Sequence, residues 1–379
     1  MLIPFIIEPG YGSSSVWSTA IRAGIDSELA RKKYSSVFID GQRAEEFDFD
    51  AVFPDGRPRL AALVGTSPSF VPEMIEKLAL RDVDVLLVSY QPPENAPVRG
   101  VVRIDYAAGA ETLLRHLADC GCKRTALYGC FLNSSTDLVK RRAYLEYITA
   151  SGAEPLMFDN TSGLLGCFER LSAGLRAGEL DSVVCVNDIA AVSLVTRLTG
   201  LGVGIPEEIQ IASFGGSEVS RVCRPAITVL EMPNFELGRQ TVNAFSYLAK
   251  SPRGINLSVR VAGELVVRES TRPLAAGRAE KACRVRRSLT QSFYDDAEVE
   301  RIARLEKLLS VCEDIDRAIL GLLLAGDTTE RIAEELSLAP ESVRYRVRRL
   351  VQSTGMTSRS ELLGFIRENG FETMIVNDL

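Results

Sequence analysis

The chain has 379 residues, of which 46% are hydrophobic and 25% are charged, a composition typical of a globular protein with about two or three domains. The formal net charge of -6 and the pI of about 5.3 exclude a uniformly basic nucleic-acid-binding protein, so a basic surface must be local. No segment approaches the roughly 20 consecutive apolar residues of a membrane span.

Short apolar runs alternate with amphipathic helical stretches from Met1 to about Lys250, which predicts parallel sheets with helices on their faces. No basic segment precedes the first apolar run, so we interpret it as a buried strand rather than a signal peptide and expect a cytoplasmic protein. Two successive α/β units of about 100 residues each predict a two-lobed body. The predicted strands are 2–7, 36–39, 60–64, 85–89, 101–104, 123–130, 155–158, 182–186 and 210–214, and helices are predicted over 16–32 and 105–118.

A glycine- and serine-rich loop, PGYGSSS, follows the first predicted strand and leads into a helix. Ligands of open α/β sheets gather at the carboxyl ends of strands, and a helix N-terminus with hydroxyl groups favours an anionic or polyhydroxyl ligand. Tyr11, Ser13 and Ser15 are therefore candidate ligand contacts. A nucleotide site and a plain tight turn are the alternatives, although the loop has neither G-x-G-x-x-G nor the lysine of a P-loop. Trp17, the only tryptophan, either stacks on a sugar ring or packs in the core.

Further candidate polar residues follow later strands or lie in later helices. Asp105 opens a helix, Lys140 and Arg141 lie in another, and Asn187 follows the strand 182–186. Each also has a purely structural interpretation, because Asp105 can cap its helix and the cations can form a solvated helix face.

The eight cysteines are scattered through predicted strands and helices, as expected of reduced, buried thiols. Cys120 and Cys122 form the only close pair, and His116 is the only histidine. Structural zinc usually takes four nitrogen or sulfur ligands, so this group is weak support for a metal site and we predict no metal and no cofactor.

Three segments carry a resemblance over Met1 to about Glu269. They are IDYAAGAETLLRHLADCGCKRTALYG, DSVVCVNDIAAVSLVTRLTGLGVGIPEEIQIASFGG and RPAITVLEMPNFELGRQTV. This part of the chain resembles the effector-binding core of LacI/GalR regulators, which is itself similar to periplasmic sugar-binding proteins. The resemblance implies a two-lobed, periplasmic-binding-protein-like (type I) α/β body of parallel sheets. It also implies that Asn187 faces the cleft and that Lys140 replaces an arginine that contacts the ligand.

The chain departs from that pattern after the strand 210–214, where the family's F-D-D or Y-D-D is replaced by Phe214, Gly215 and Gly216. The replacement deletes a carboxylate that would accept hydrogen bonds from sugar hydroxyls. Residues after Phe214, including Gly216 and Arg221, should line the opposite wall of the cleft. With Lys140, Arg141, Arg221 and Arg224 nearby, a sugar acid or sugar phosphate is as plausible as a neutral sugar.

The residues beyond this body predict a linker and a second domain. We place the effector-binding domain at 1–272, an exposed basic linker at 273–294, a linking helix at 295–312 and a helix-turn-helix domain at 313–379. In the linking helix, Ile302, Leu305, Leu309 and Cys312 have heptad-like spacing. This stripe either pairs two subunits or docks the helix on its own domain.

The segment DTTERIAEELSLAPESVRYRVRRLVQSTG predicts two helices joined by a tight turn. Pro340 fits the first turn of the second helix, in which Val343, Val347, Leu350 and Val351 form the inner stripe. The outer and flanking residues suit a phosphate-lined groove, although an ordinary solvated helix face is the alternative. The expected DNA contacts are Thr329, Glu341, Ser342, Arg344, Tyr345, Arg346, Arg348, Arg349 and Arg359, of which Glu341, Arg344, Tyr345 and Arg348 should face bases.

The stretch from about Asp314 to Glu368 resembles the LuxR-type (GerE-like) DNA-binding domain. The resemblance includes the acidic Asp316, the closing Gly326, the step Ser342-Val343-Arg344, and the sequence SRSEL at 358–362. Ala339 replaces the usual serine or threonine cap before the recognition helix, at a cost of about 1 kcal/mol.

Together these features predict an α/β body with an all-α C-terminal helix-turn-helix domain, acting as a ligand-responsive, non-enzymatic transcription regulator. Its expected partners are a small-molecule effector and a palindromic DNA operator bound by a homodimer, with no membrane. Two alternatives stay open. One is a small-molecule enzyme on a doubly wound fold, although no nucleophile is paired with a base. The other is a ligand sensor whose C-terminal domain binds protein.

Overall fold

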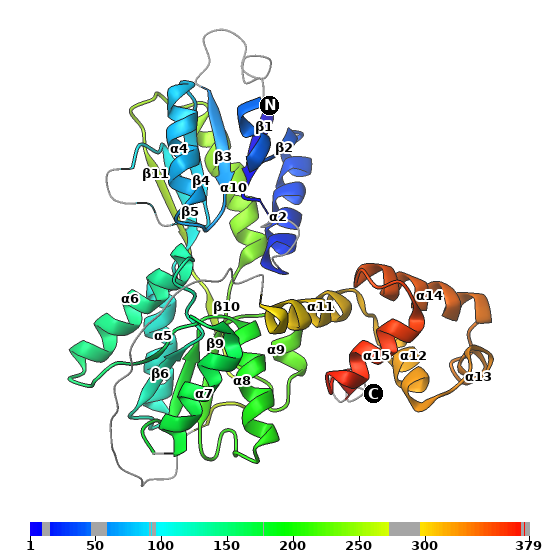
Figure 1. The fold of residues 1–379 in the computed structure, drawn as a ribbon. Helices are drawn as coiled ribbons and strands as arrows, with labels where there is room; N and C mark the ends of the chain where they lie inside the picture. The colour runs from blue at the N-terminus through cyan, green and yellow to red at the C-terminus, as the bar shows by residue number, and fades with distance from the viewer. Residues whose placement is uncertain are drawn as a thin grey trace.

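A computed structural model describes residues 1–9, 16–46, 59–90, 92, 96–176, 178–272, 296–372 and 375, without the side chains of residues 16, 17, 45 and 46. Two α/β lobes form a body, and a small helical domain is attached to it through a single helix (Figure 1). The predicted two-lobed α/β architecture is therefore confirmed. The linker predicted at 273–294 lies outside the described residues.

The first lobe is a six-stranded, fully parallel sheet in the order β2-β1-β3-β4-β5-β11. Neighbouring residues of a strand face opposite sides, so Phe5 packs with α2 and α10, whereas Ile6 packs with α4 on the other face. Its elements are β1 (Leu2–Ile7), α2 (Val16–Lys32), β2 (Ser35–Asp40), η1 (Gly41–Glu46), β3 (Leu60–Val64), α4 (Phe70–Leu80), β4 (Asp84–Val88), β5 (Gly100–Ile104), α10 (Asn234–Leu248) and β11 (Leu257–Val261).

The second lobe has the sheet order β12-β10-β9-β8-β6-β7, in which only β12 is antiparallel. Leu127 packs on one face with α5 and α6, whereas Ala126 packs on the other with α7 and α8. Its elements are α5 (Tyr106–Asp119), β6 (Thr125–Tyr128), α6 (Ser135–Ala150), β7 (Leu156–Phe158), α7 (Gly163–Arg176), β8 (Ser182–Cys185), α8 (Asp188–Gly200), β9 (Gln210–Gly215), α9 (Glu218–Val222), β10 (Thr228–Glu231) and β12 (Glu264–Val266).

The chain crosses between the lobes three times, after β5, after β10 and between β11 and β12. The predicted division into two successive units is therefore wrong in one respect, because α10 and β11 return to the first lobe. The sequence analysis assigned no strand to β10, β11 or β12. These strands have three to five residues, too few to give a clear period, and the partner of β11, β5, is distant in sequence.

The C-terminal domain consists of α12 (Asp314–Ala325), α13 (Thr329–Glu335), α14 (Pro340–Ser353) and α15 (Arg359–Glu368), as predicted. Gly326 ends α12 in a left-handed conformation, and Pro340 occupies the first turn of α14. The inner stripe of α14 is buried as predicted, since Val343, Val347, Leu350 and Val351 are 0–8% exposed.

Helix α11 (Ala297–Val311) joins this domain to the second lobe. It lies against α8 and α9 of that lobe and against α14 of the C-terminal domain, and it also reaches α2 of the first lobe (Figure 1). Ile302, Leu305 and Leu309 are almost fully buried in these contacts within one chain. Of the two interpretations of the heptad-like stripe, the structure therefore shows the helix docked on its own chain, and this stripe is not free to pair two subunits.

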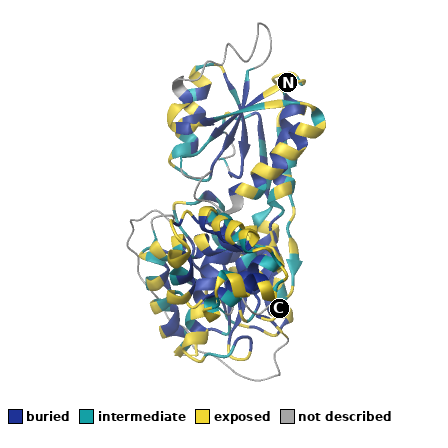
Figure 2. Ribbon diagram, turned by 90° about the vertical axis from the view of Figure 1, so that its right-hand side faces the viewer, coloured by how far each residue is buried: buried dark blue, intermediate teal, exposed yellow. Residues whose placement is uncertain are grey.

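Burial follows the layers of the fold, with buried strands inside and exposed helix faces outside (Figure 2). In the described part of the chain, no helix combines the length and the apolar composition that a membrane crossing requires.

Candidate functional site

The crossovers fix where the two lobes face each other. Strand β5 runs directly into α5 of the second lobe, and β10 runs directly into α10 of the first. Because the other strands of the first sheet, and β6 to β9 of the second, run parallel to these two, their carboxyl ends all meet at the junction between the lobes. The backbone N–H of Ser135 donates across this junction to the carbonyl of Thr66 (3.0 Å), so the two edges are in contact beside the cleft.

On the side of the first lobe, Glu8 directly follows β1 and points its carboxylate toward the loop after β3. The backbone N–H groups of Thr66 and Ser67 donate to Glu8 Oε2, at 2.7 and 3.2 Å, and burial raises the pKa of Glu8. The sequence analysis missed this residue, although a polar residue at the carboxyl end of a strand is the same feature that singled out Asn187.

The predicted contacts Tyr11, Ser13 and Ser15 lie outside the described residues, and so does the side chain of Trp17. Within the described residues of the first lobe, the structure has a cavity of about 230 Å³ between α2 and the strands β1, β2 and β3. Its lining is mostly apolar, and the polar side chains come from the start of α2. The lining residues are Ile7, Ser18, Thr19, Ile21, Arg22, Ile25, Phe38 and Val64.

On the side of the second lobe, Lys140 is 4% exposed, and its ammonium group contacts a carboxylate, a carbonyl and two aromatic rings. Its Nζ donates to Asp137 Oδ1 (3.0 Å) and to the Val186 carbonyl (2.8 Å), and it lies 4.8 and 5.1 Å from the ring centroids of Tyr106 and Phe214. The predicted ligand-binding cation therefore lies at the junction, but its charge is already balanced by Asp137.

Arg141 lies beside Lys140 on α6 and pairs with Asp159, its Nε lying 3.3 Å from Asp159 Oδ1. Ser135, at the start of α6, is 6% exposed, and its buried Oγ has no hydrogen-bond partner among the described residues. An unpartnered hydroxyl at the edge of a cleft is suited to donate to a ligand.

Two neighbouring residues after β8, Asn187 and Asp188, make different contacts. Asn187 caps α8, since its Oδ1 accepts from Ala190 N–H (2.9 Å), and its side chain is buried. Asp188, which is 1% exposed, reaches the loop after β9, where its Oδ2 accepts from Gly216 N–H (2.9 Å) and Ser217 N–H (2.8 Å).

This contact explains the change from F-D-D to F-G-G. A Cβ on Gly215 would lie 1.9 Å from Asp188 Oδ1, and Gly216 has a φ of +111°, so neither position accepts an ordinary side chain. The end of β9 therefore keeps a carboxylate, but it comes from Asp188 and is occupied by backbone donors.

The remaining candidates near the junction are engaged within the protein. Asp105 caps α5 by accepting from Ala108 N–H (3.3 Å) and also pairs with Arg260. Arg221 pairs with Glu218 on α9, and Arg224 donates to nearby carbonyl groups of its own chain. Of the cations predicted near the cleft, Lys140, Arg141 and Arg221 are thus held by carboxylates.

Comparisons with known proteins identify the fold of the two-lobed body. Residues 114–271 match the periplasmic binding protein-like domain family. The HTH-type transcriptional repressor PurR of Haemophilus influenzae is 22% identical over 273 residues, covering 69% of this chain and 80% of PurR. The crystal structure of a LacI family transcriptional regulator from Mycobacterium smegmatis has a TM-score of 0.57 and 20% identity, and covers 72% of this chain and 100% of that one. A ribose-bound LacI family regulator from Enterococcus faecium has a TM-score of 0.56 and 17% identity, with 72% and 100% covered.

The body is a periplasmic-binding-protein-like fold. It has the two-lobed form of the LacI-family structures, with the junction between the lobes at the carboxyl ends of both sheets.

The cysteines of this periplasmic-binding-protein-like body offer no metal centre within the described residues, where no three histidine, cysteine or acidic side chains lie together as metal ligands would. His116 Nε2 hydrogen-bonds with Thr271 Oγ1 (2.9 Å) and lies 3.7 Å from Cys120 Sγ, and burial lowers the pKa of His116. The seven described cysteines are free, and burial raises the pKa of Cys122 to about 12. They match the expectation of reduced, buried thiols.

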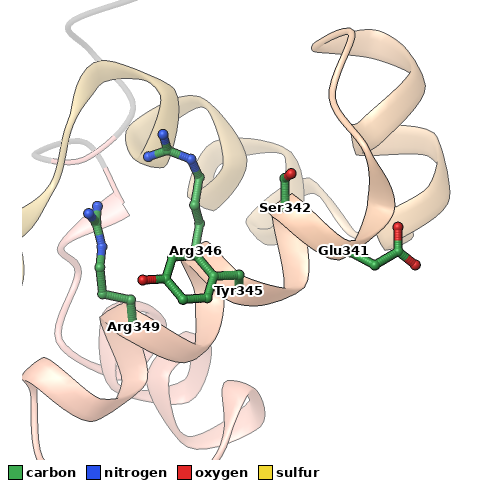
Figure 3. Close-up of a pocket in the computed structure, with 5 residues that line it drawn as sticks. All are labelled: Glu341, Ser342, Tyr345, Arg346 and Arg349. Carbon is green, nitrogen blue, oxygen red and sulfur yellow. The ribbon is translucent and has the colours of Figure 1, made fainter.

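The C-terminal domain beyond this body presents α14 to solvent. Arg346 and Arg349 point to the same side of α14 in Figure 3, toward the start of α12. Arg346 Nη1 lies 3.0 Å from Asp316 Oδ1, and Arg349 also pairs with Asp316, whose side chain is fully buried. Both arginines also pair with Glu313. These two predicted phosphate contacts therefore fasten α14 to α12.

Arg344, Tyr345 and Arg348 form the outer face of α14. Arg344 pairs loosely with Glu330 and Glu341, at 3.3 and 3.6 Å, and Tyr345 is 67% exposed. Arg348 is exposed and has no ion-pair partner among the described residues. An open hollow of about 370 Å³ beside this face is lined by Glu341, Ser342, Tyr345, Arg346 and Arg349.

A second helix brings further predicted contacts to this region. Arg359 opens α15, and its Nη1 donates to Oγ1 of Thr329 (3.4 Å), which opens α13. Three helices, α13, α14 and α15, thus carry the predicted DNA contacts.

Proposed function

We propose that this protein is a ligand-responsive transcription regulator. Its effector binds in the cleft between the lobes, and its C-terminal domain, which resembles the LuxR-type domain, binds DNA. The observation that carries the proposal is the outer face of α14, which holds Arg344, Tyr345 and Arg348 in solvent while Arg346 and Arg349 brace the helix from behind. The relatives named as transcription regulators support the same class of protein over an enzyme.

A neutral polyhydroxyl effector fits the cleft better than a sugar acid or a sugar phosphate. An anionic ligand would have to compete with Asp137 and Asp159 for Lys140 and Arg141, whereas a hydroxyl ligand can accept from Ser135 and donate to Glu8. The ribose bound by the Enterococcus faecium regulator has this chemistry.

Thermal-shift measurements with ribose, gluconate and ribose 5-phosphate distinguish these classes, because a ligand that binds only the folded state raises the apparent melting temperature. A shift with ribose alone supports the neutral class, and a shift only with the two anions contradicts it.

The regulator should bind DNA as a homodimer on a palindromic operator, with two recognition helices about one DNA turn apart. Closure of the cleft would change how the two bodies pack and hence the distance between these helices. The apolar stripe of α11 is not available for this pairing, so the dimer contact must use another surface.

The test of DNA binding compares Arg348→Ala with Arg142→Ala. Arg142 is an exposed arginine on α6, 83% exposed and paired with Glu146, and its replacement removes the same formal charge as a control. On a random-sequence duplex, binding is electrostatic and Arg348 acts through its charge rather than by selecting a base. Arg348→Ala should weaken binding at low salt by roughly tenfold and, over a salt series, lower the slope against log salt by about 1. Arg142→Ala should bind like the parent protein. Equal affinities of all three proteins would overturn the assignment of this face to DNA.

A further inference from the structure

Helix α9 lies where three parts of the molecule meet. It follows the loop Gly215 to Ser217 at the cleft end of β9, and it packs on α8 and on α11. The shape of this loop depends on the two glycines and on the Asp188 carboxylate, as described above. A change in the loop therefore has α9 as its first neighbour along the chain.

Asp188 also prevents Ser217 from capping α9. Ser217 is the residue before the helix, but its Oγ donates to Asp188 Oδ2 (2.5 Å) and makes no capping bond. The two first N–H groups of the helix are instead bound from outside. Glu218 N–H and Val219 N–H donate to the two carboxylate oxygens of Glu306, at 3.2 and 2.8 Å. Glu306 belongs to α11, so the linking helix supplies the cap that Ser217 does not.

The DNA-binding domain reaches the same point. Arg317 of α12 is 6% exposed, and its Nη2 lies 3.7 Å from Glu218 Oε2. One end of α9 is therefore in contact with α11 through Glu306 and with α12 through Arg317.

The start of α11 is hydrogen-bonded to the start of α7 and to α8, both in the second lobe. Asp296 accepts from Leu164 N–H (2.9 Å) at the start of α7, and Glu298 accepts from Ser193 Oγ (2.5 Å) on α8. Glu298 also pairs with Arg197. Because this end is held, a movement of α9 acts on the middle of α11 and on α12 rather than shifting the whole helix.

We propose that the loop Gly215 to Ser217 and α9 transmit effector occupancy of the cleft to the C-terminal domain, with Glu306 and Arg317 as the positioning residues. This proposal rests on the proposed function, since it assigns the route between the effector cleft and the DNA-binding domain. The polar contacts pass from Asp188 to the loop, from α9 to Glu306 and from Glu218 to Arg317.

Hydrogen–deuterium exchange of the full-length protein tests this route without a known effector or operator. Ser217→Ala removes the hydroxyl that Asp188 binds and so perturbs the loop from the cleft side. In the parent background we expect about fivefold faster exchange in α9 and in α12. Combined with Glu306→Gln, the added effect of Ser217→Ala on α12 should fall below about twofold. Combined with Glu300→Gln, an exposed glutamate on α11, the full effect should remain.

Asp188→Asn is measured in parallel, as a second perturbation of the same loop. The proposal is overturned when neither variant changes exchange in α12, or when the effect on α12 is the same with Glu306→Gln as with Glu300→Gln. An equal increase in α10 of the first lobe also overturns it, because that result indicates general loosening. The exchange experiment contains no DNA. Its result can therefore be interpreted even if the Arg348→Ala experiment shows that this face does not bind DNA.

Discussion

At the scale of single residues, Asp316 shows how a buried charge can hold a surface helix. Its fully buried carboxylate accepts from Glu313 N–H (3.0 Å) and pairs with Arg346 and Arg349. Asp316→Ala leaves two guanidinium groups without their inner partner, and we expect a loss of about 2 to 3 kcal/mol in the free energy of unfolding. Urea denaturation followed by circular dichroism measures it. Asp314→Ala, an exposed acid in the same helical turn, should change stability by less than about 0.5 kcal/mol.

Glu306 predicts a specific dependence of stability on pH. Its pKa is raised to about 7, chiefly by burial and to a smaller extent by the nearby carboxylates of Asp188 and Glu218, against two backbone donors that lower the pKa. Arg317 faces Glu218 from α12. Because the folded-state pKa lies above the ordinary value of 4.5, the stability contributed by protonated Glu306 is complete below about pH 4.5 and is lost as the pH rises through about 7.

Glu306→Gln removes this titration while keeping an acceptor for α9. The parent protein should lose on the order of 2 to 3 kcal/mol relative to the variant between about pH 5 and pH 8. Urea denaturation at both pH values gives the difference. Asp188, whose pKa burial also raises, is present in both proteins, so the difference between them reports Glu306 together with its interaction with Asp188. Parallel stability curves for the two proteins would show that Glu306 has an ordinary pKa.

At the scale of elements, the start of α14 is its weak point. Ala339 has the extended backbone of a capping residue, with φ -75° and ψ 141°, but no side-chain acceptor. Ala339→Ser should therefore stabilise the protein by about 1 kcal/mol and slow amide exchange in the first turn of α14. Ala339→Val is the control, because valine tolerates the same backbone and cannot cap. Equal exchange in both variants would mean that Pro340 alone fixes this helix start.

Elements that bury one continuous stripe were predictable from sequence. The strands β1 and β3 and the helix α2 were placed at their observed bounds, because short apolar runs and the glycine-rich loop that precedes α2 are local signals. The strands β10 to β12 were not, because they have only three to five residues and β11 pairs with β5, which is distant in the sequence.

The candidate site, too, was predictable from sequence only in part. Lys140 and Asn187 were placed at the junction by resemblance, but their engagement with Asp137 and Ala190 depends on side-chain contacts that a sequence does not show. The outer face of α14 was predicted correctly for Arg348, whereas Arg349 turned out to bind Asp316, a residue 33 positions away in the chain. Helical periodicity gives the direction of a side chain but not the partner that it finds.

At the scale of the whole molecule, the second lobe and the C-terminal domain share one hydrophobic core. Buried residues of α8, of α11 and of α12 to α15 belong to a single cluster, in which Leu305 of α11 is fully buried. Two domains joined by a continuous core should unfold as one cooperative unit. In the parent protein, amide exchange in α8 and in α12 should therefore depend on urea concentration in the same way.

Leu305→Ala should separate these two units. Removing the side chain leaves a cavity where α11 meets both domains and costs about 2 to 5 kcal/mol, so α12 should open at lower urea concentration than α8. Arg304→Ala, on the exposed side of the same helix, should leave the two transitions together. If α8 and α12 already respond differently in the parent protein, the shared core does not couple the domains. In the proposed regulator, a shift of α9 can reposition α14 only if α12 moves together with the part of α11 that α9 contacts.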